Sequence, residues 1–137
     1  NMDGYKNLIK MVSTSYVEGF YYKPRVDIDE LKKYSDGIIA LSACLAGDIS
    51  QALMDRNYEK AKNIALQYRD IFGEGNFYLE IQDHGLPEQK EVNAALVKLS
   101  KEINIPLVAT NDIHYVNKED SKIHDVLMCI QNGKNSE

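Results

Sequence analysis

The chain has 137 residues, of which 44% are hydrophobic and 27% are charged, a composition that is ordinary for one globular domain. Its formal net charge of -5 argues against a broadly basic, DNA-binding surface, so any role with DNA is local or depends on another domain. No apolar run approaches the roughly 20 residues of a membrane span. Cys44 and Cys129 show no CxxC spacing, and no signal-like leader precedes them. We therefore expect a cytoplasmic protein with reduced thiols and no membrane contact.

The first 37 residues predict two helices joined by an irregular segment. A helix is expected from about Tyr5, with Asp3 placed to cap its start. Residues 19–25, GFYYKPR, break its period and predict a loop or a short extended piece. Asp27, with an acid three residues later, predicts a short second helix through about residue 34. The expected buried face of the first helix consists of Tyr5, Leu8, Ile9, Val12 and Tyr16.

Three apolar strands alternating with helices are predicted in the remainder of the chain. Strands are expected at 38–41, 77–81 and 106–109, and helices at 48–54, 58–72, after Pro87 through Ile103, and at 118–130. Strict alternation favours parallel pairing, in an α/β sheet or part of a barrel. We expect one compact unit, in which the tail 135–137 is the only linker-like stretch.

Polar residues follow each predicted strand, where ligands bind in parallel α/β folds. Cys44 follows the first strand and His84 the second, while Asp112 and His114 follow the third. On an extended chain the side chains of Asp112 and His114 project to the same side, and a thiolate from Cys44 would complete a donor set suited to Zn²⁺ or a similar ion. In the alternative interpretation, Asp112 caps a turn, His114 is a hydrogen-bonded histidine and Cys44 is a small core residue.

Other candidate residues keep two interpretations each. Asp83 and His84 suit either a site or an Asx turn with a packing histidine, and Glu80 faces either a barrel interior or solvent. His124 and Cys129 are most simply structural. An aromatic and basic cluster suits contacts with phosphate or a base, or packing between domains; it consists of Tyr21, Tyr22, Lys23 and Arg25. No P-loop, GxGxxG or GxSxG motif occurs.

Five segments, in order, carry a family resemblance: GYKNLIKMVS, GFYYKPRVD, SACLAGDI, FYLEIQDHGLPEQ and ATNDIHYV. Together they resemble the PHP (polymerase and histidinol phosphatase) domain of the alpha subunits of bacterial DNA polymerase III, the C-family replicative polymerases. The resemblance implies a distorted barrel of about seven βα units with metal ions at its carboxyl rim. Residues 1–137 resemble only the later, carboxyl-terminal part of this domain. The implied fold is a partial distorted (β/α)7 barrel, a single unit cut from a longer chain without its earlier strands.

The resemblance carries three metal ligands onto this chain and no catalytic residue. Cys44 matches the family's SAC motif, and Asp112 and His114 match NDIH. No metal role is carried onto Glu80, Asp83 or His84, which match a further segment of the family. The implied metal of an intact PHP domain is Zn²⁺ or Mn²⁺, whereas Mg²⁺ serves the parent polymerase. Because the remaining ligands belong to earlier strands, we expect this chain alone to bind metal weakly or not at all.

The resemblance also implies a function for the parent protein. That protein is a DNA-directed DNA polymerase, a nucleotidyltransferase that acts on DNA and dNTPs with other replisome subunits. Its polymerase site lies outside this chain, which is therefore expected to be inactive alone. The PHP domain implies metal binding and metal-dependent phosphoester hydrolysis, including 3′–5′ exonuclease proofreading. The alternatives are a PHP domain that serves only as a scaffold and partner-binding module, and an unrelated barrel enzyme. Missing strands would expose a sheet edge, so we also expect self-association.

Overall fold

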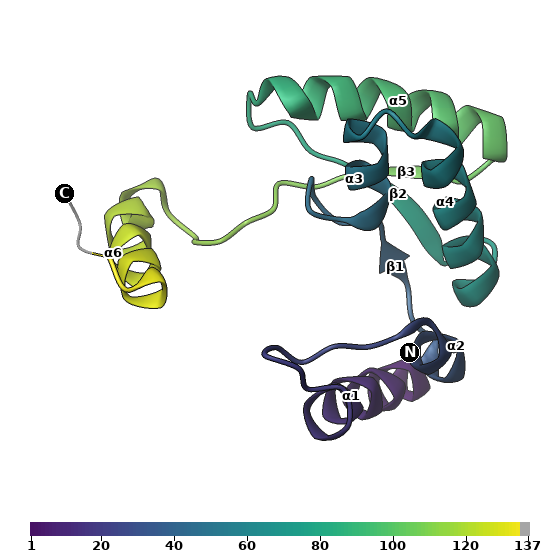
Figure 1. The fold of residues 1–137 in the computed structure, drawn as a ribbon, viewed down its shortest axis with the longest axis horizontal. Coiled ribbons are helices and arrows are strands. Elements are labelled where there is room, and N and C mark those ends of the chain that lie inside the picture. The colour runs from purple at the N-terminus through teal and green to yellow at the C-terminus, as the bar shows by residue number, and fades with distance from the viewer. Residues whose placement is uncertain (135–137) are drawn as a thin grey trace.

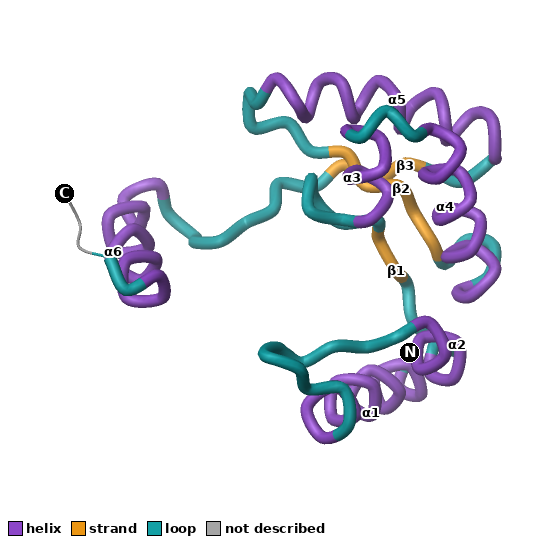
Figure 2. Tube along the Cα trace, in the orientation of Figure 1, coloured by secondary structure: helices purple, strands orange, loops and turns teal. Residues whose placement is uncertain are grey.

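The computed structural model describes residues 1–134, and the linker-like tail predicted at 135–137 lies outside this range. Strands alternate with helices along the chain (Figures 1 and 2). The elements are α1 (Met2–Val17), α2 (Ile28–Tyr34), β1 (Ala40–Leu41), α3 (Asp48–Met54), α4 (Tyr58–Phe72), β2 (Phe77–Ile81), α5 (Pro87–Ile103), β3 (Leu107–Ala109), the 3₁₀ turn η1 (Lys118–Asp120) and α6 (Ser121–Asn132). Within residues 1–134, every helix is too short or too polar to cross a lipid bilayer.

The strands form an open parallel sheet, which confirms the predicted α/β class and is consistent with part of a barrel. Within residues 1–134, the strand order is β1-β2-β3. Ala40 pairs with Phe77, and Leu79 pairs with Leu107. The outer strands are shorter than predicted, since β1 has two residues and β3 has three. Each outer strand pairs on one side only within the described chain, so fewer ladder hydrogen bonds extend it.

The hydrophobic core lies between the sheet and helices α3, α4 and α5. Helix α5 contributes an apolar stripe at helical spacing, and its Leu96 and Leu99 are fully buried beside Leu79 of β2. Burying a side chain of this kind contributes roughly 1.5–3 kcal/mol. These helices pack on β2 at the centre of the sheet. The loops that follow the strands therefore begin at well-packed elements.

Helix α1 differs from the prediction in its cap and in its buried face. The side chain of Asn1, not Asp3, accepts the capping hydrogen bond from the backbone of Gly4, at 2.9 Å. Gly4 packs so tightly on the turn after α2 that an added Cβ would lie 2.0 Å from the carbonyl oxygen of Gly37. This contact turns the narrow face of Gly4 and Met11 inward. The predicted buried face is therefore exposed, with exposed fractions between 46% and 61% at Tyr5, Leu8, Ile9, Val12 and Tyr16.

Two parts of the chain lie away from the sheet and its helices. Helices α1 and α2 pack together at one side, and α6 lies at the end of the extended segment after β3 (Figure 1). Apolar side chains of α6 remain exposed, among them Ile123, Val126, Leu127 and Ile130. The described chain therefore presents two amphipathic helices whose apolar faces are exposed.

Candidate metal site at the carboxyl edge of the sheet

Parallel pairing brings the segments after all three strands to one edge of the sheet, as the sequence predicts. A hydrogen-bonded network joins them through Glu80 of β2. The backbone N–H of Glu80 donates to Oγ of Ser42, at 2.8 Å, and the hydroxyl of Thr110 donates to the Glu80 carboxylate. The Gln82 amide donates to Glu80 Oε1, at 3.0 Å, and to Thr110 Oγ1, at 3.2 Å. Glu80 is therefore half-buried, and its carboxylate accepts bonds from Gln82 and Thr110.

Asp112 lies in a conformation that the sequence did not predict. Its φ of 47° is in the left-handed region, so the chain is not extended there, and the predicted projection of Asp112 and His114 to one side does not follow from strand geometry. Both residues are exposed. Asp is among the few residue types that tolerate this conformation, because its short polar side chain bonds locally.

The hydrogen bond of His114 determines which of its ring nitrogens is available. Nδ1 lies 2.7 Å from the carbonyl oxygen of Asp112. A carbonyl oxygen only accepts hydrogen bonds, so Nδ1 carries a hydrogen, and in the neutral ring Nε2 is then the nitrogen with the lone pair. Histidine ligands of metals commonly have this arrangement, in which a bond from one nitrogen fixes the tautomer of the other. His114 is thus prepared to be a metal ligand through Nε2.

His84 uses both ring nitrogens within the protein. Nε2 lies 2.8 Å from the carbonyl oxygen of Asn111, and Nδ1 lies 2.9 Å from the side-chain nitrogen of Gln89. Asp83 accepts from the backbone N–H of Gly85, at 3.0 Å, as an Asx turn does. Of the two interpretations of this loop, the structural one accounts for every polar contact of His84, whose ring has no nitrogen left for a metal.

Cys44 is half-buried, with a free thiol, in the loop between β1 and α3. It lines a cavity of about 10 Å³ together with Glu80, Gln82, Gln89 and Asn93. A space of this size is comparable to that of one water molecule, so it does not admit a substrate. Cys44 is therefore on the predicted edge of the sheet, on the side of β2 that faces α3 and α5.

The donors present fit part of a metal site. A thiol, an exposed carboxylate and an imidazole with an available Nε2 are ligand types that suit Zn²⁺, and the carboxylate also suits Mn²⁺. Within residues 1–134, no three side chains of His, Cys, Asp or Glu converge where they could hold an ion. The structure thus brings Cys44, Asp112 and His114 to one edge of the sheet without gathering them around a single point.

Sequence reasoning assigned only a structural role to His124 on α6, and the structure brings its ring close to the candidate ligand. Its ring centroid lies 5.9 Å from that of His114 and 5.3 Å from that of Tyr115. The network residues Gln82, Gln89 and Thr110 were also missed. For Gln89 the sequence shows only a polar residue near the start of a predicted helix, five residues after His84; its burial is seen in the structure.

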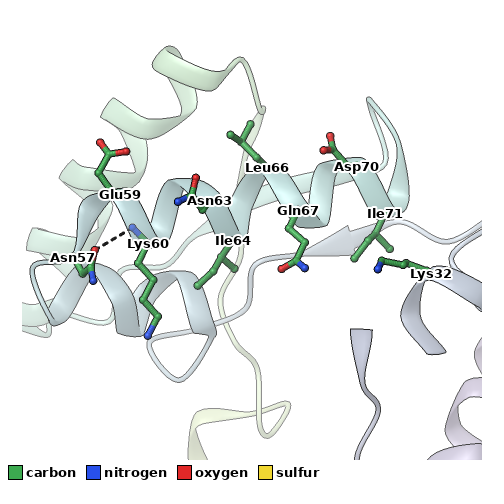
Figure 3. Close-up of a pocket in the computed structure, with 10 residues that line it drawn as sticks. All are labelled: Lys32, Asn57, Glu59, Lys60, Asn63, Ile64, Leu66, Gln67, Asp70 and Ile71. Atoms are coloured by element: carbon green, nitrogen blue, oxygen red, sulfur yellow. Dashed lines mark hydrogen bonds between the residues drawn. The ribbon is translucent and has the colours of Figure 1, made fainter. Parts of the chain in front are cut away.

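A separate open groove of about 1060 Å³ runs along α4 and reaches Lys32 of α2. The side chains on one side of α4 are those of Lys60, Ile64, Gln67 and Ile71, and Lys32 lies near Ile71 on that same side (Figure 3). The groove mixes acidic, basic and apolar side chains and includes none of the three predicted ligands. It is therefore distinct from the edge of the sheet where the polar network lies.

Comparison with known proteins found one matching family model and several similar proteins. A family model described as "PHP domain" matches residues 1–84. DNA polymerase III subunit alpha of Borreliella burgdorferi is 51% identical over 130 residues, which are 95% of this chain and 11% of that protein. The corresponding subunit of Treponema pallidum is 46% identical over 135 residues, 98% of this chain and 12% of that protein. For Deinococcus radiodurans, identity is 47% over 131 residues, 96% of this chain and 10% of that protein. The chain thus spans about a tenth of the length of these relatives.

Proposed function

Because this chain belongs to the PHP domain family and is homologous to DNA polymerase III alpha subunits, we propose that it forms part of a metal-binding PHP domain in a replicative polymerase. In this proposal residues 1–137 are the carboxyl-terminal portion of that domain, and other strands complete the barrel. The open parallel sheet supports the proposal, since an unclosed edge can continue into further strands.

Cys44, Asp112 and His114 are the proposed ligands that this chain supplies. The observation that carries the proposal is the bond from His114 Nδ1 to the carbonyl oxygen of Asp112, because it leaves Nε2 available to an ion. Three donors from one edge are an incomplete set, so the chain alone binds Zn²⁺ or Mn²⁺ weakly and further ligands come from the rest of the barrel. Such an ion, when bound, activates water for phosphoester hydrolysis. The chain's own residues orient the ring of His114 and leave its Nε2 accessible.

The activity of the longer protein is part of the same proposal. It synthesises DNA from dNTPs with Mg²⁺ in the cytoplasm, together with other replisome subunits, and its PHP domain removes nucleotides as a 3′–5′ exonuclease. This chain takes no direct part in synthesis, since its proposed donors serve the PHP site. Hydrolysis and synthesis are therefore separable by substitution.

The test uses the full-length polymerase that carries this chain, with Asp112→Asn and His114→Ala made separately. Each substitution removes one proposed ligand, and losing a ligand of this kind lowers metal content and 3′–5′ hydrolysis at least about tenfold. DNA synthesis is expected to remain. Metal is measured by mass spectrometry and hydrolysis on a 3′-labelled primer. The control is Asp70→Asn, an acid on the outer side of α4 whose partner is Arg69. Unchanged metal content in both ligand variants would contradict the proposal.

The alternative function is that of a scaffold and partner-binding module. It is favoured by the exposed apolar side chains of α1, which include Tyr5 and Tyr16 at 57% and 61% exposure. In that case the full-length protein shows no hydrolysis that depends on His114. Replacing Tyr16 with Glu would instead weaken its association with a neighbouring subunit or domain.

A further inference from the structure

We infer that His84 and Gln89 are positioning residues that fix the loop after β3, where the proposed ligands Asp112 and His114 lie. The inference rests on the proposed function, since it assigns to these two residues the orientation of that function's ligands. Neither residue touches the metal itself in this account. Their contacts begin in α5 and end at the backbone next to Asp112.

Gln89 holds His84 at two points. Its Oε1 accepts from the backbone N–H of His84, at 2.7 Å, and its Nε2 donates to Nδ1 of the His84 ring, at 2.9 Å. Gln89 is only 5% exposed, and a buried amide is costly unless its polar atoms are bonded. The two bonds satisfy one acceptor and one donor of that amide, and they fix the direction of the imidazole ring.

The partners of His84 also fix its tautomer. The carbonyl oxygen of Asn111 only accepts, so His84 Nε2 carries the hydrogen, and the Gln89 nitrogen only donates, so Nδ1 carries the lone pair. His84 is therefore a neutral ring that bridges two segments. It accepts from Gln89 of α5 and donates to the backbone of the loop after β3.

The bond from His84 to the Asn111 carbonyl is made one residue before Asp112, which has the least favourable backbone conformation in the loop after β3. Asp112 has a φ of 47°, a conformation that costs most non-glycine residues roughly 1–2 kcal/mol. The Asn111 carbonyl belongs to the peptide group that precedes Asp112, so holding its oxygen limits rotation at this position. The Asp112 carbonyl then accepts from His114 Nδ1. The His114 ring is thus bonded to the peptide group that follows Asp112, and His84 holds the peptide group that precedes Asp112.

A second contact reaches the same loop from α5. Asn93 Nδ2 donates to the carbonyl oxygen of Gln82, at 2.8 Å, and the Gln82 amide donates to Oγ1 of Thr110. Thr110 is fixed in this way, one residue before the bond from His84. Two contacts that originate in α5 therefore hold the loop where it leaves β3, and removing the His84 contact releases only the part of the loop after Thr110.

The experiment uses a matched pair of substitutions, His84→Gln and His84→Asn, in the 137-residue chain. The amide nitrogen of Gln reaches about as far as imidazole Nε2 and can donate to the Asn111 carbonyl, whereas that of Asn reaches only as far as Nδ1. Both variants keep the backbone bond to Gln89. A third variant, Gln89→Leu, keeps His84 but removes both bonds that hold it.

Two measurements follow the loop and the metal: NMR spectra of the 137-residue chain, and Zn²⁺ titration of the full-length polymerase with the same substitutions. Without metal, backbone amide signals of residues 111–114 are expected to stay in place in His84→Gln and to shift and broaden in His84→Asn and Gln89→Leu. In the full-length polymerase, where the proposal places the remaining ligands, residues that orient a ligand commonly contribute about 10–100-fold to metal affinity. His84→Asn and Gln89→Leu should therefore bind Zn²⁺ that much more weakly there, and His84→Gln within about threefold of the unsubstituted protein. Signals of the core residues Leu79 and Leu99 report whether each variant is folded.

The two proposals fail in different ways. If the original chain and the full-length polymerase do not respond to Zn²⁺, the proposed function fails, and the metal-free signals still decide whether His84 holds the loop. If His84→Asn is folded and leaves residues 111–114 unchanged, the positioning role is wrong. Equal Zn²⁺ affinity in His84→Gln and His84→Asn overturns it as well. Should His84→Asn not fold, Gln89→Leu gives the same comparison.

Discussion

At the scale of single residues, left-handed backbone positions mark the ends of regular structure. Asn104 ends α5 with a φ of 55°, and Asp112 follows β3 with a φ of 47°. At both places a short polar side chain tolerates a conformation that most side chains disfavour. The two positions have similar φ angles but different roles. Asn104 turns the chain from α5 toward β3, whereas Asp112 sets the direction of the polar loop after β3.

Substitution of Asn104 tests the first of these positions without touching the candidate site. Asn104→Gly should leave the free energy of unfolding unchanged or raise it slightly, because glycine adopts positive φ without a steric penalty. Asn104→Val should lower it by about 1–2 kcal/mol, because a β-branched side chain clashes there. Urea unfolding followed by circular dichroism measures both. Equal stability of the two variants would contradict this account of the α5 end.

The residue types of the site could be predicted from the sequence, but their roles could not be separated. Cys44, His84, Asp112 and His114 all follow strands, and position at a strand end is a property that sequence pattern can report. Which histidine keeps a nitrogen available depends on hydrogen bonds between segments distant in sequence, such as that from His84 to Asn111. Periodicity and spacing contain no information on those partners.

At the scale of elements, the bounds predicted from the sequence agree best with the structure where a helix and the element it packs on lie close in the sequence. The predicted bounds 48–54, 58–72 and 77–81 coincide with α3, α4 and β2, and these elements pack on one another. Helix α1 was also predicted, but its buried face was wrong, because the contact of Gly4 with Gly37 selects the face. An amphipathic pattern reports which side chains favour burial, whereas close backbone contact decides which of them are buried.

The junction of α3, α4 and β2 predicts a loss of stability in alkali. Tyr68 packs on Phe77, with ring centroids 5.6 Å apart, and donates to Asp48, at 2.9 Å. Burial and this hydrogen bond raise the pKa of Tyr68 to about 12. The folded chain then keeps a proton that the unfolded chain releases above its ordinary pKa of about 10. The contribution of Tyr68 to the free energy of unfolding is therefore complete below about pH 10 and falls as the pH rises toward 12.

Tyr68→Phe isolates that contribution. Burial, followed by the bond to Glu102, also raises the pKa of Tyr58 to about 12, so the substitution should reduce the alkaline decline without abolishing it. Urea unfolding of both proteins at several pH values between 9 and 11.5 measures the difference. An identical dependence on pH in the two proteins would show that Tyr68 ionises as readily in the folded chain as in the unfolded one.

At the scale of the whole molecule, the described chain is a packed α/β body with two amphipathic helices, α1 and α6, that lie away from its sheet (Figure 1). Helix α2 joins α1 to that body through contacts with α4, and an extended segment leads from β3 to α6 (Figure 1). The sequence predicted the order of these elements and the parallel sheet. It could not predict where α1 and α6 lie, because an apolar face indicates a need for a partner and carries no information on which surface provides it.

Those exposed faces predict that the isolated 137-residue chain associates with itself. Ile123, Val126, Leu127 and Ile130 of α6 are 50–73% exposed, and β1 and β3 have unpaired edges within the described residues. Each Å² of apolar surface that association removes from water contributes roughly 25 cal/mol of favourable free energy. Dimers or larger species should therefore form as the concentration rises. Light scattering coupled to size-exclusion chromatography over a range of concentrations measures the mass.

A matched pair of variants on α6 identifies the surface responsible. Ile130→Glu places a charge on the apolar face and should shift the chain toward monomer, because burying an unpaired carboxylate opposes association. Gln131→Glu adds the same charge to the neighbouring exposed residue and should leave the mass unchanged. A strict monomer at every concentration in the unsubstituted chain would overturn the prediction. Equal effects of the two variants would assign association to net charge and not to the face of α6.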